Sequence, residues 1–385
     1  MHKSLLALLA TSLISGIYWS LIYPIYQPFI LSLGASMTLL GLIEAISGRM
    51  GLLSTVAQLI GGAASDAYGR KRIIVLSSGL IVAGLTLYLL SSLKHELFYL
   101  IIGSILIGAS CMSIPARNAL IAELSKPEVR GYIYSLILFA AVLPSAVFSP
   151  IGGWIAEKLG FQIIFSIAVP MEAACLFTLA LLIAESRSSD MGRMDLKDIL
   201  RGIIPPRGLM RKLYMIIAVD TFSWSTGSIL LYGFISETYG FTETQLGILS
   251  SAFSTSWAIS QIPAGKFIDR FGAKKSLIIS EALGILAVLM WMLSKDFNTY
   301  LISHIIFGIT PPLWVPALNT YIAGKVGRKD LGKAMGGISA FRGLISFPAP
   351  YIGGMLFDNY GIQAPLIINA LGAFIALLGL IRLED

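Results

Sequence analysis

Long apolar stretches alternate along this chain with short polar connections. Each stretch holds about 20 residues or more, the length that a helix needs to cross the hydrocarbon core of a bilayer. The stretches lack the alternation of barrel strands, and a backbone in lipid must satisfy its own hydrogen bonds, so helices are expected. The pattern predicts twelve spans, near residues 4–32, 38–62, 73–92, 98–122, 133–155, 162–184, 213–235, 245–265, 276–293, 299–323, 334–356 and 363–381.

Composition supports a membrane protein rather than a soluble one. Of the 385 residues, 56% are hydrophobic and only 13% are charged, whereas about a quarter of the residues in soluble domains are charged. The first apolar run continues well beyond the length of a signal-peptide core, so we expect it to be retained as the first span.

The distribution of basic residues predicts an orientation. If the N-terminus is cytoplasmic, 22 of the 28 Lys and Arg residues fall in cytoplasmic segments and 3 fall outside. By the positive-inside rule this places both termini in the cytoplasm of a cell-membrane protein. The formal charge of +7 then follows from topology, and no nucleic-acid partner is expected.

One long connection divides the chain. It contains Ser, Gly, a Pro-Pro pair and mixed charges, and it joins the sixth and seventh spans. We therefore expect an N-terminal six-helix bundle over 1–184, a cytoplasmic linker over 185–212 and a C-terminal six-helix bundle over 213–385.

The two halves repeat each other. The pattern G-x3-D-x2-G occurs in GGAASDAYGRKR and again in AGKFIDRFGAKK, 203 residues later. The segments IPARNALIAELSKPEVRG and VPALNTYIAGKVGRKDLG match at an offset of 201. Because six spans return the chain to the same side, the repeat is parallel, about an axis along the membrane normal.

These motifs resemble the major facilitator superfamily over the whole chain. GGAASDAYGRKR resembles that family's loop between helices 2 and 3, although Ala67 stands where a base is usual. APYIGG and SPIGG resemble a Gly/Pro-rich element of its antiporters. APYIGG lies in the eleventh span, and SPIGG, in the fifth, is one residue short. Ser104 stands where many members have a helix 4 arginine. The resemblance implies an all-α fold of twelve helices in two bundles, in the manner of drug:proton antiporters.

The repeated loop is the expected gate. Its first copy contains Gly62, Asp66, Gly69 and Arg70, and Asp66 can pair with Arg70, with Glu123 as a third member. The resemblance implies that this loop closes the cytoplasmic side. The second copy has Gly324 where the first has Glu123, which predicts a weaker latch. Its motif residues are Gly265, Asp269 and Gly272.

Charges inside the spans are candidates for proton coupling, because an ionised side chain near mid-bilayer is costly. Asp220 in the seventh span is the foremost candidate and Glu44 in the second is another. A carboxyl that moves between apolar surroundings and a nearby base gains and loses a proton. The alternative for Asp220 is a static salt bridge to Arg117 or Arg342. Glu172 is interpreted as an equal candidate for helix packing and function, and Glu281 as an interfacial charge.

Aromatic and basic residues outline an expected substrate pathway. Aromatic side chains with few fixed charges suit an amphipathic ligand, although an interfacial aromatic belt is the alternative. The expected pathway residues are Tyr18, Tyr23, Arg49, Arg117, Trp224, Trp314, Asn319 and Arg342.

The leading interpretation is a secondary transporter that works by alternating access and exports amphipathic compounds in exchange for protons. A proton-coupled importer of a sugar or an organic anion is the alternative. A membrane-embedded enzyme lacks any metal or nucleophile motif in this sequence, an ATP-driven pump lacks a phosphate-binding loop, and a non-transporting sensor has no appended soluble domain to support it. We expect a monomer in the lipid bilayer, without cofactor or metal, whose ligands are a small molecule and protons.

Overall fold

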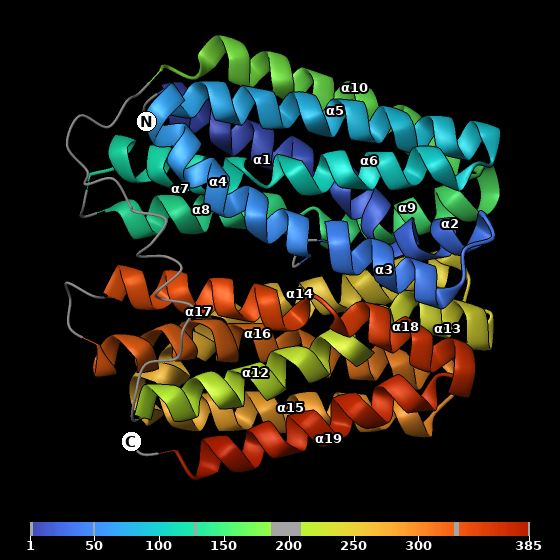
Figure 1. Ribbon diagram of the computed structural model, residues 1–385, viewed down its shortest axis with the longest axis vertical. Coiled ribbons are helices and arrows are strands. Elements are labelled where there is room, and N and C mark those ends of the chain that lie inside the picture. Colours follow the sequence, from blue (N-terminus) through green and yellow to red (C-terminus); the bar gives the residue numbers. More distant parts are fainter. Residues whose placement is uncertain (1–2, 49–50, 127–128, 186–208, 327–330, 384–385) are drawn as a thin grey trace. The chain divides into compact units, whose positions relative to one another are not determined.

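The described part of the chain is helical in a computed structural model, as Figure 1 shows. The structure describes residues 3–48, 51–126, 129–185, 209–326 and 331–383. The all-helical prediction is confirmed. The helices of the first half are α1 (Lys3–Ile22), α2 (Tyr26–Ser32), α3 (Met37–Ser47), α4 (Leu52–Tyr68), α5 (Arg70–Lys94), α6 (Leu97–Ser110), α7 (Ser113–Leu124), α8 (Arg130–Val142), α9 (Ser145–Leu159) and α10 (Phe161–Leu182). Those of the second half are α12 (Leu209–Gly227), α13 (Leu231–Tyr239), α14 (Glu243–Phe271), α15 (Ala273–Leu293), α16 (Phe297–Lys325), α17 (Leu331–Ser346), α18 (Ala349–Tyr360) and α19 (Gln363–Ile381).

Two compact units make up the chain, and each includes a short segment from the opposite half of the sequence. Unit 1 consists of residues 1–35, 46–194 and 242–247. Unit 2 consists of residues 36–45, 195–241 and 248–385. The expected linker over 185–212 lies mostly outside the described residues, so the division of the chain at that linker stays a prediction.

Several expected spans are built from two helices rather than one. The first is interrupted by a 3-10 turn at Tyr23–Ile25, where Pro24 has no amide hydrogen to continue the helix. Pro144 and Pro348 stand directly before α9 and α18. The interruption between α12 and α13 corresponds, at the repeat offset of 206, to the one in the first span. The breaks therefore belong to the repeat.

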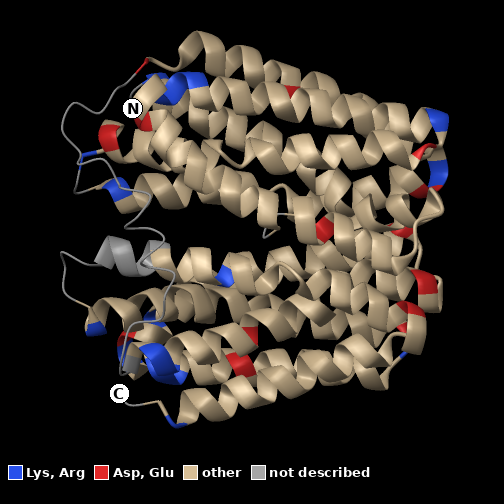
Figure 2. Ribbon diagram, in the orientation of Figure 1, with Lys and Arg blue, Asp and Glu red and all other residues tan. Residues whose placement is uncertain are grey.

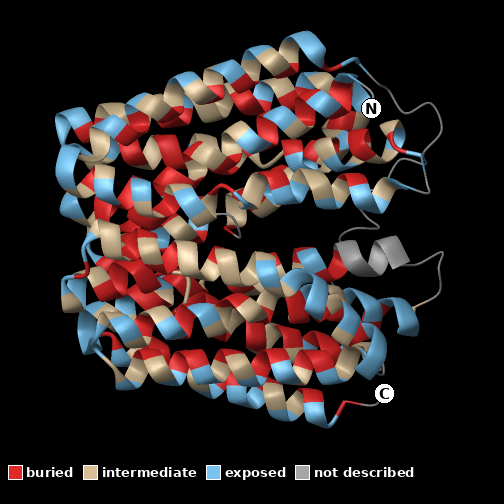
Figure 3. Cartoon of the chain, turned by 180° about the vertical axis from the view of Figure 1, so that it is seen from behind, coloured by how far each residue is buried: buried red, intermediate tan, exposed pale blue. Residues whose placement is uncertain are grey.

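The helices suit a bilayer in length and surface. Among the described residues, ten helical segments are long and apolar enough to cross a membrane. The expected spans over 245–265 and 334–356 are not among these segments, so the count of twelve stays a prediction. Large apolar side chains lie exposed, among them Phe177, Leu181, Ile259 and Leu293. Exposed positions recur along the helices of both units (Figure 3). An apolar exterior of this kind requires lipid around it.

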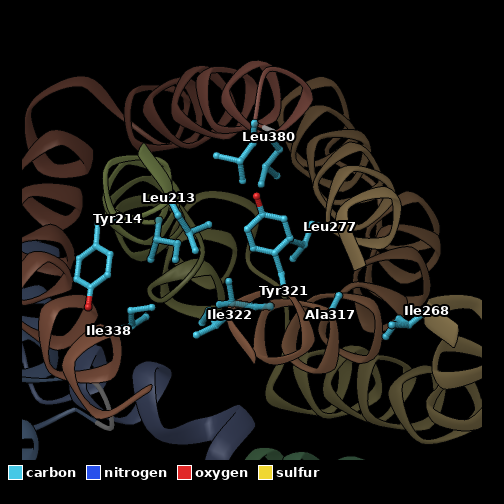
Figure 4. Packing of buried hydrophobic residues seen from close by; sticks show 12 residues of the cluster. Leu213, Tyr214, Ile268, Leu277, Ala317, Tyr321, Ile322, Ile338 and Leu380 are labelled. Carbon is cyan, nitrogen blue, oxygen red and sulfur yellow. The ribbon is translucent and has the colours of Figure 1, made fainter. Parts of the chain in front are cut away.

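Each unit has its own apolar core. In unit 1 the core joins α1, α5, α7, α8 and α10 through residues such as Leu8, Ile74 and Leu120. In unit 2 the ring of Tyr321 lies among Leu213, Leu277 and Leu380 (Figure 4). These cores fix the helices that carry the charged clusters described below.

Charged residues concentrate at helix ends. In both units, Lys and Arg gather at the end that carries the chain terminus, whereas few charges interrupt the helix middles (Figure 2). The exceptions in the helix middles are therefore the candidates for function.

Candidate functional site

The first copy of the repeated loop holds an ionic cluster around the buried Arg70 in unit 1. Gly69 has a φ of 101°, which favours glycine, and it separates α4 from α5. Arg70, the first residue of α5, is only 2% exposed, and its Nη2 lies 2.6 Å from Glu123 Oε1 and 3.6 Å from Asp66 Oδ1. The structure thus brings together the three side chains that the sequence grouped. Gly62 lies on α4 where the helix packs near Pro115 of α7.

A fourth member of this cluster was not predicted. Glu185, which follows α10, accepts a hydrogen bond from the backbone N–H of Lys71 at 3.2 Å. Its carboxylate occupies the space that a Cβ at Gly69 would need. A negative charge here also stabilises the N-terminus of α5. The sequence analysis assigned Glu185 to the linker, and no pattern in the sequence connects it with the start of α5.

The second copy of the loop is open. Gly272 has a φ of 90° and marks the same turn, but no atom of the described residues lies within 4 Å of where a Cβ of Gly265 or Gly272 would stand. Asp269 is exposed and has no ion-pair partner among the described residues. Gly324, at the position of Glu123, is exposed as well. The two copies therefore differ in the direction that the sequence predicts.

Glu123→Gln is expected to loosen the loop in unit 1. The change leaves the buried Arg70 guanidinium without its shorter carboxylate contact, so the free energy of unfolding of this region should fall by about 1–3 kcal/mol. Faster hydrogen exchange in peptides from α4 and α5 of the full chain would measure the loss. Asp269→Asn is the matched control and should leave exchange unchanged in its own loop. Equal effects of the two changes would contradict a special role for the Arg70 cluster.

A buried carboxylate joins three helices in unit 1. Glu172 of α10 is 1% exposed. Its Oε2 accepts a hydrogen bond from Tyr18 of α1 at 2.8 Å, and its Oε1 accepts one from Ser78 of α5 at 2.5 Å. Arg117 acts on it electrostatically. Tyr18, an expected pathway residue, is therefore placed in the packed interior, with its hydroxyl engaged by an acid.

Tyr18→Phe is expected to destabilise unit 1. It removes the hydroxyl that donates to a buried carboxylate, an interaction worth about 1.5–3 kcal/mol. Chemical unfolding of the full chain, followed by circular dichroism, would measure the change. Tyr132→Phe makes the same change on an exposed side chain and should have almost no effect. A stability equal to that of the parent protein would mean that the Glu172 contact contributes nothing.

Unit 2 contains a pair of buried acids. Asp220 of α12 is 4% exposed and Glu281 of α15 is 2% exposed. Electrostatically, each carboxyl group influences the other, Trp224 influences both, and Arg342 of α17 acts on Asp220. The Nε of Arg342 also donates a hydrogen bond to Thr221 Oγ1 at 3.1 Å.

The buried position of Glu281 corrects its interpretation as an interfacial charge, and Asp220 stays a candidate for proton coupling. Glu281 was interpreted as an interfacial charge, but it is buried against Asp220, because α15 turns this face toward α12. At the repeat offset of 203 Glu281 corresponds to Ser78, which the structure also buries. Arg342 rather than Arg117 is the base that the structure places beside Asp220 within unit 2.

The other expected site residues lie apart from these clusters. Tyr23 is 60% exposed in the 3-10 turn, and Asn319 is exposed on α16. Glu44 is half-buried on α3, and Trp314 packs against the core cluster of unit 2. Arg49 lies outside the described residues.

Two acids cap helices across the halves of the sequence. In unit 2, Asp358 of α18 accepts hydrogen bonds from the backbone N–H of Met37 at 3.2 Å and of Thr38 at 2.8 Å, and from the Thr38 hydroxyl at 2.6 Å. In unit 1, Glu157 of α9 accepts one from the backbone N–H of Thr244 at 3.4 Å. Asp358 and Glu157 are equivalent at the repeat offset of 201. Carboxylates at helix N-termini are stabilising.

Glycines allow the backbones to meet beside these caps. A Cβ at Gly354 would overlap the carbonyl of Met37, and a Cβ at Gly153 would overlap that of Glu243. These two glycines are again equivalent at an offset of 201. They lie within APYIGG and SPIGG, so the motif residues serve close helix approach.

The chain is similar to known proteins along its length. The family model described as Major Facilitator Superfamily matches residues 8–219 and 213–385. The chain is 26% identical to Multidrug resistance protein 1 of Bacillus subtilis over 386 residues, which cover 96% of this chain and 94% of that protein. It is 28% identical to an uncharacterised MFS-type transporter of Methanocaldococcus jannaschii over 186 residues. This match covers 46% of this chain and 47%, about half, of that protein.

The fold is similar to a solved structure over almost its full length. The crystal structure of a D-xylose-proton symporter matches with a TM-score of 0.72 and 17% sequence identity, over 100% of this chain and 98% of that chain. At this identity the likeness concerns the fold alone.

Proposed function

Because the chain belongs to the major facilitator superfamily, we propose that this multi-pass membrane transporter works by alternating access and couples the export of amphipathic compounds to proton entry. The family resemblance seen in the sequence motifs is confirmed. The proposal places twelve spans in a monomer in the cell membrane, with both termini cytoplasmic, in line with the positive-inside distribution.

The buried acid at Asp220 carries the proposal. It lies on α12 at 4% exposure, with Arg342 acting on it. A carboxylate in such surroundings favours its neutral form, whereas the arginine favours the ionised form. A change in the balance between these two influences during the transport cycle would load and release a proton. Glu44 is proposed as an accessory acid.

The names of relatives support export. Multidrug resistance protein 1 of Bacillus subtilis matches 96% of this chain, and aromatic side chains such as Trp224 and Trp314 suit amphipathic ligands. We propose that the pathway also includes Tyr23, Asn319 and Arg117, and that the Asp66–Arg70–Glu123 cluster holds the cytoplasmic side closed.

A proton-coupled importer is the second candidate. The likeness to a D-xylose-proton symporter supports the fold of such a protein, and Arg117 and Arg342 would suit an anionic group. Import of a sugar is less well supported, because few amide side chains lie in the proposed pathway.

A proteoliposome assay tests the proposed function. The full chain is reconstituted, a pH gradient is imposed in either direction, and a mixed panel of lipophilic cations, sugars and organic anions is followed by mass spectrometry. We expect the lipophilic compounds to move across the membrane in the direction opposite to the flow of protons. Movement that ignores the gradient would exclude proton coupling, and co-transport of a sugar or anion with protons would select the importer instead.

A further inference from the structure

Two buried carboxyl groups, Asp220 and Glu281, lie close to each other in unit 2, and the base Arg342 acts on Asp220. Trp224 lies over Gly284 of α15, because a Cβ there would stand 2.6 Å from Cζ2 of the indole. Asp220 precedes Trp224 by four residues on α12, and Glu281 precedes Gly284 by three on α15, so each acid lies on the helix face that carries this contact. Helix geometry and the side-chain interactions of the pair therefore agree that Asp220 and Glu281 face each other.

We propose that Asp220 and Glu281 form one proton-binding site, in which a single proton is held between the two carboxyl groups and Arg342 balances the remaining charge. With both acids ionised, two negative charges would face one positive charge in an apolar interior, and like charges at close range disfavour that state. With one proton bound, the three side chains are neutral as a group. A buried group of charges is tolerated when it is paired in this way.

An unpaired oxygen supports the bound proton. Glu281 Oε1 is buried and has no hydrogen-bond partner among the described residues. An ionised carboxylate would leave a charged acceptor unsatisfied at this point, which is costly in an apolar environment. A protonated Glu281, with its hydrogen directed to Asp220, leaves only a neutral carbonyl oxygen unsatisfied.

The equivalent position in unit 1 gives a contrast. At the repeat offsets, Ser78 corresponds to Glu281 and Tyr18 corresponds to Trp224. In unit 1 these hydroxyls donate to both oxygens of one acid, Glu172. One carboxylate with two donors is satisfied without a proton, whereas two facing carboxyls are not. The second half of the repeat thus has an acid where the first half has a hydroxyl donor.

Among the described side chains, the neighbouring helices add no second base to the pair. From α16, Phe307 stacks on Trp224, with ring centroids 5.3 Å apart. From α19, the neutral amide of Asn369 lies against Gly227, and from α17 the facing charge is Arg342. The nearest titratable group on α16 is His304, one turn before Phe307, whose ring stacks on Tyr232 instead.

Infrared spectroscopy of the full chain in lipid bilayers tests proton sharing. The C=O stretch of protonated carboxyl groups is recorded while pH is varied, with Glu172→Gln as the background that removes the other buried acid. We expect one protonated carboxyl per chain from the pair. Asp220→Asn and Glu281→Gln should each remove that band completely, because the acid that is left pairs with Arg342 as a carboxylate. The exposed Glu237→Gln is the matched control and should keep the band.

Removal of the base gives an independent measurement. Arg342→Gln takes away the balancing charge, so both carboxyls should be protonated and the band should roughly double. A band that persists in either single acid variant would show two independent acids and overturn the proposal. An unchanged amplitude in Arg342→Gln would overturn the charge balance on which it depends.

The role of the pair in coupling rests on the proposed function, whereas proton binding does not. In the proteoliposome assay, Glu281→Gln should lose gradient dependence. If the parent protein ignores the gradient, the proposed function fails and the infrared result still decides whether the proton is shared. If the parent protein is gradient-driven and Glu281→Gln remains so, Glu281 has no part in coupling.

Discussion

Asp220→Asn is expected to abolish gradient-driven transport while exchange of labelled for unlabelled compound across the membrane continues. The amide keeps the size of the side chain and removes the proton that it carries. Exchange needs only that the loaded protein changes orientation, whereas accumulation needs the proton to move with each cycle. The two activities should therefore separate in one preparation.

The measurement compares accumulation with exchange in the same proteoliposomes. Accumulation should fall to the level of protein-free vesicles, and exchange should stay close to the parent rate. Asp220→Glu keeps the carboxyl and should recover part of the accumulation, and Glu237→Gln alters an exposed acid on α13 and should change neither activity. Gradient-driven accumulation that survives in Asp220→Asn would remove this residue from the coupling mechanism.

Gly354→Ala is expected to open the contact between α18 and the start of α3. The added methyl group would overlap the carbonyl of Met37, which belongs to the backbone and cannot rotate away. Overpacking of this kind costs about 1–3 kcal/mol, so a conformation in which these helices are apart should become about tenfold more populated or more. The hydrogen bonds to Asp358 would be lost with it.

Hydrogen exchange in the full chain measures this opening. The first turn of α3 should exchange faster in Gly354→Ala, and the first turn of α14 should do so in the equivalent Gly153→Ala. Gly265→Ala adds the same methyl group where no atom lies within 4 Å, so it serves as the control. Unchanged exchange at α3 would mean that the two backbones can separate without consequence.

The sequence predicted the helices and the ionic cluster because both depend on local patterns. Apolar runs of sufficient length specify helices in lipid, and Asp66 and Arg70 are four residues apart. Glu123 was added because it stands at the cytoplasmic end of the fourth expected span. The exact ends of α19 at Gln363 and Ile381 were also predicted, since Gly361 and Arg382 bound the apolar run.

Features that depend on the packing of distant helices were not predicted. Glu281 lies early in its span, and depth alone suggests an interfacial charge, because no sequence pattern states which helix faces it. The engagement of Tyr18 by Glu172 joins residues 154 apart. The inclusion of residues 36–45 in unit 2 also depends on backbone approaches at glycines, and a single glycine in a helix does not indicate its partner.

The two helix caps differ in strength, and this difference implies an order of events in time. Asp358 accepts two backbone hydrogen bonds at the start of α3, at 3.2 and 2.8 Å, whereas among the described residues Glu157 accepts one at the start of α14, at 3.4 Å, and its other oxygen is engaged by Lys158 at 2.8 Å. The weaker attachment should break first, so residues 242–247 should leave α9 before residues 36–45 leave α18. The two halves of the repeat would then move asymmetrically, with the contact at Glu157 opening before the contact at Asp358, although the two halves share one sequence pattern.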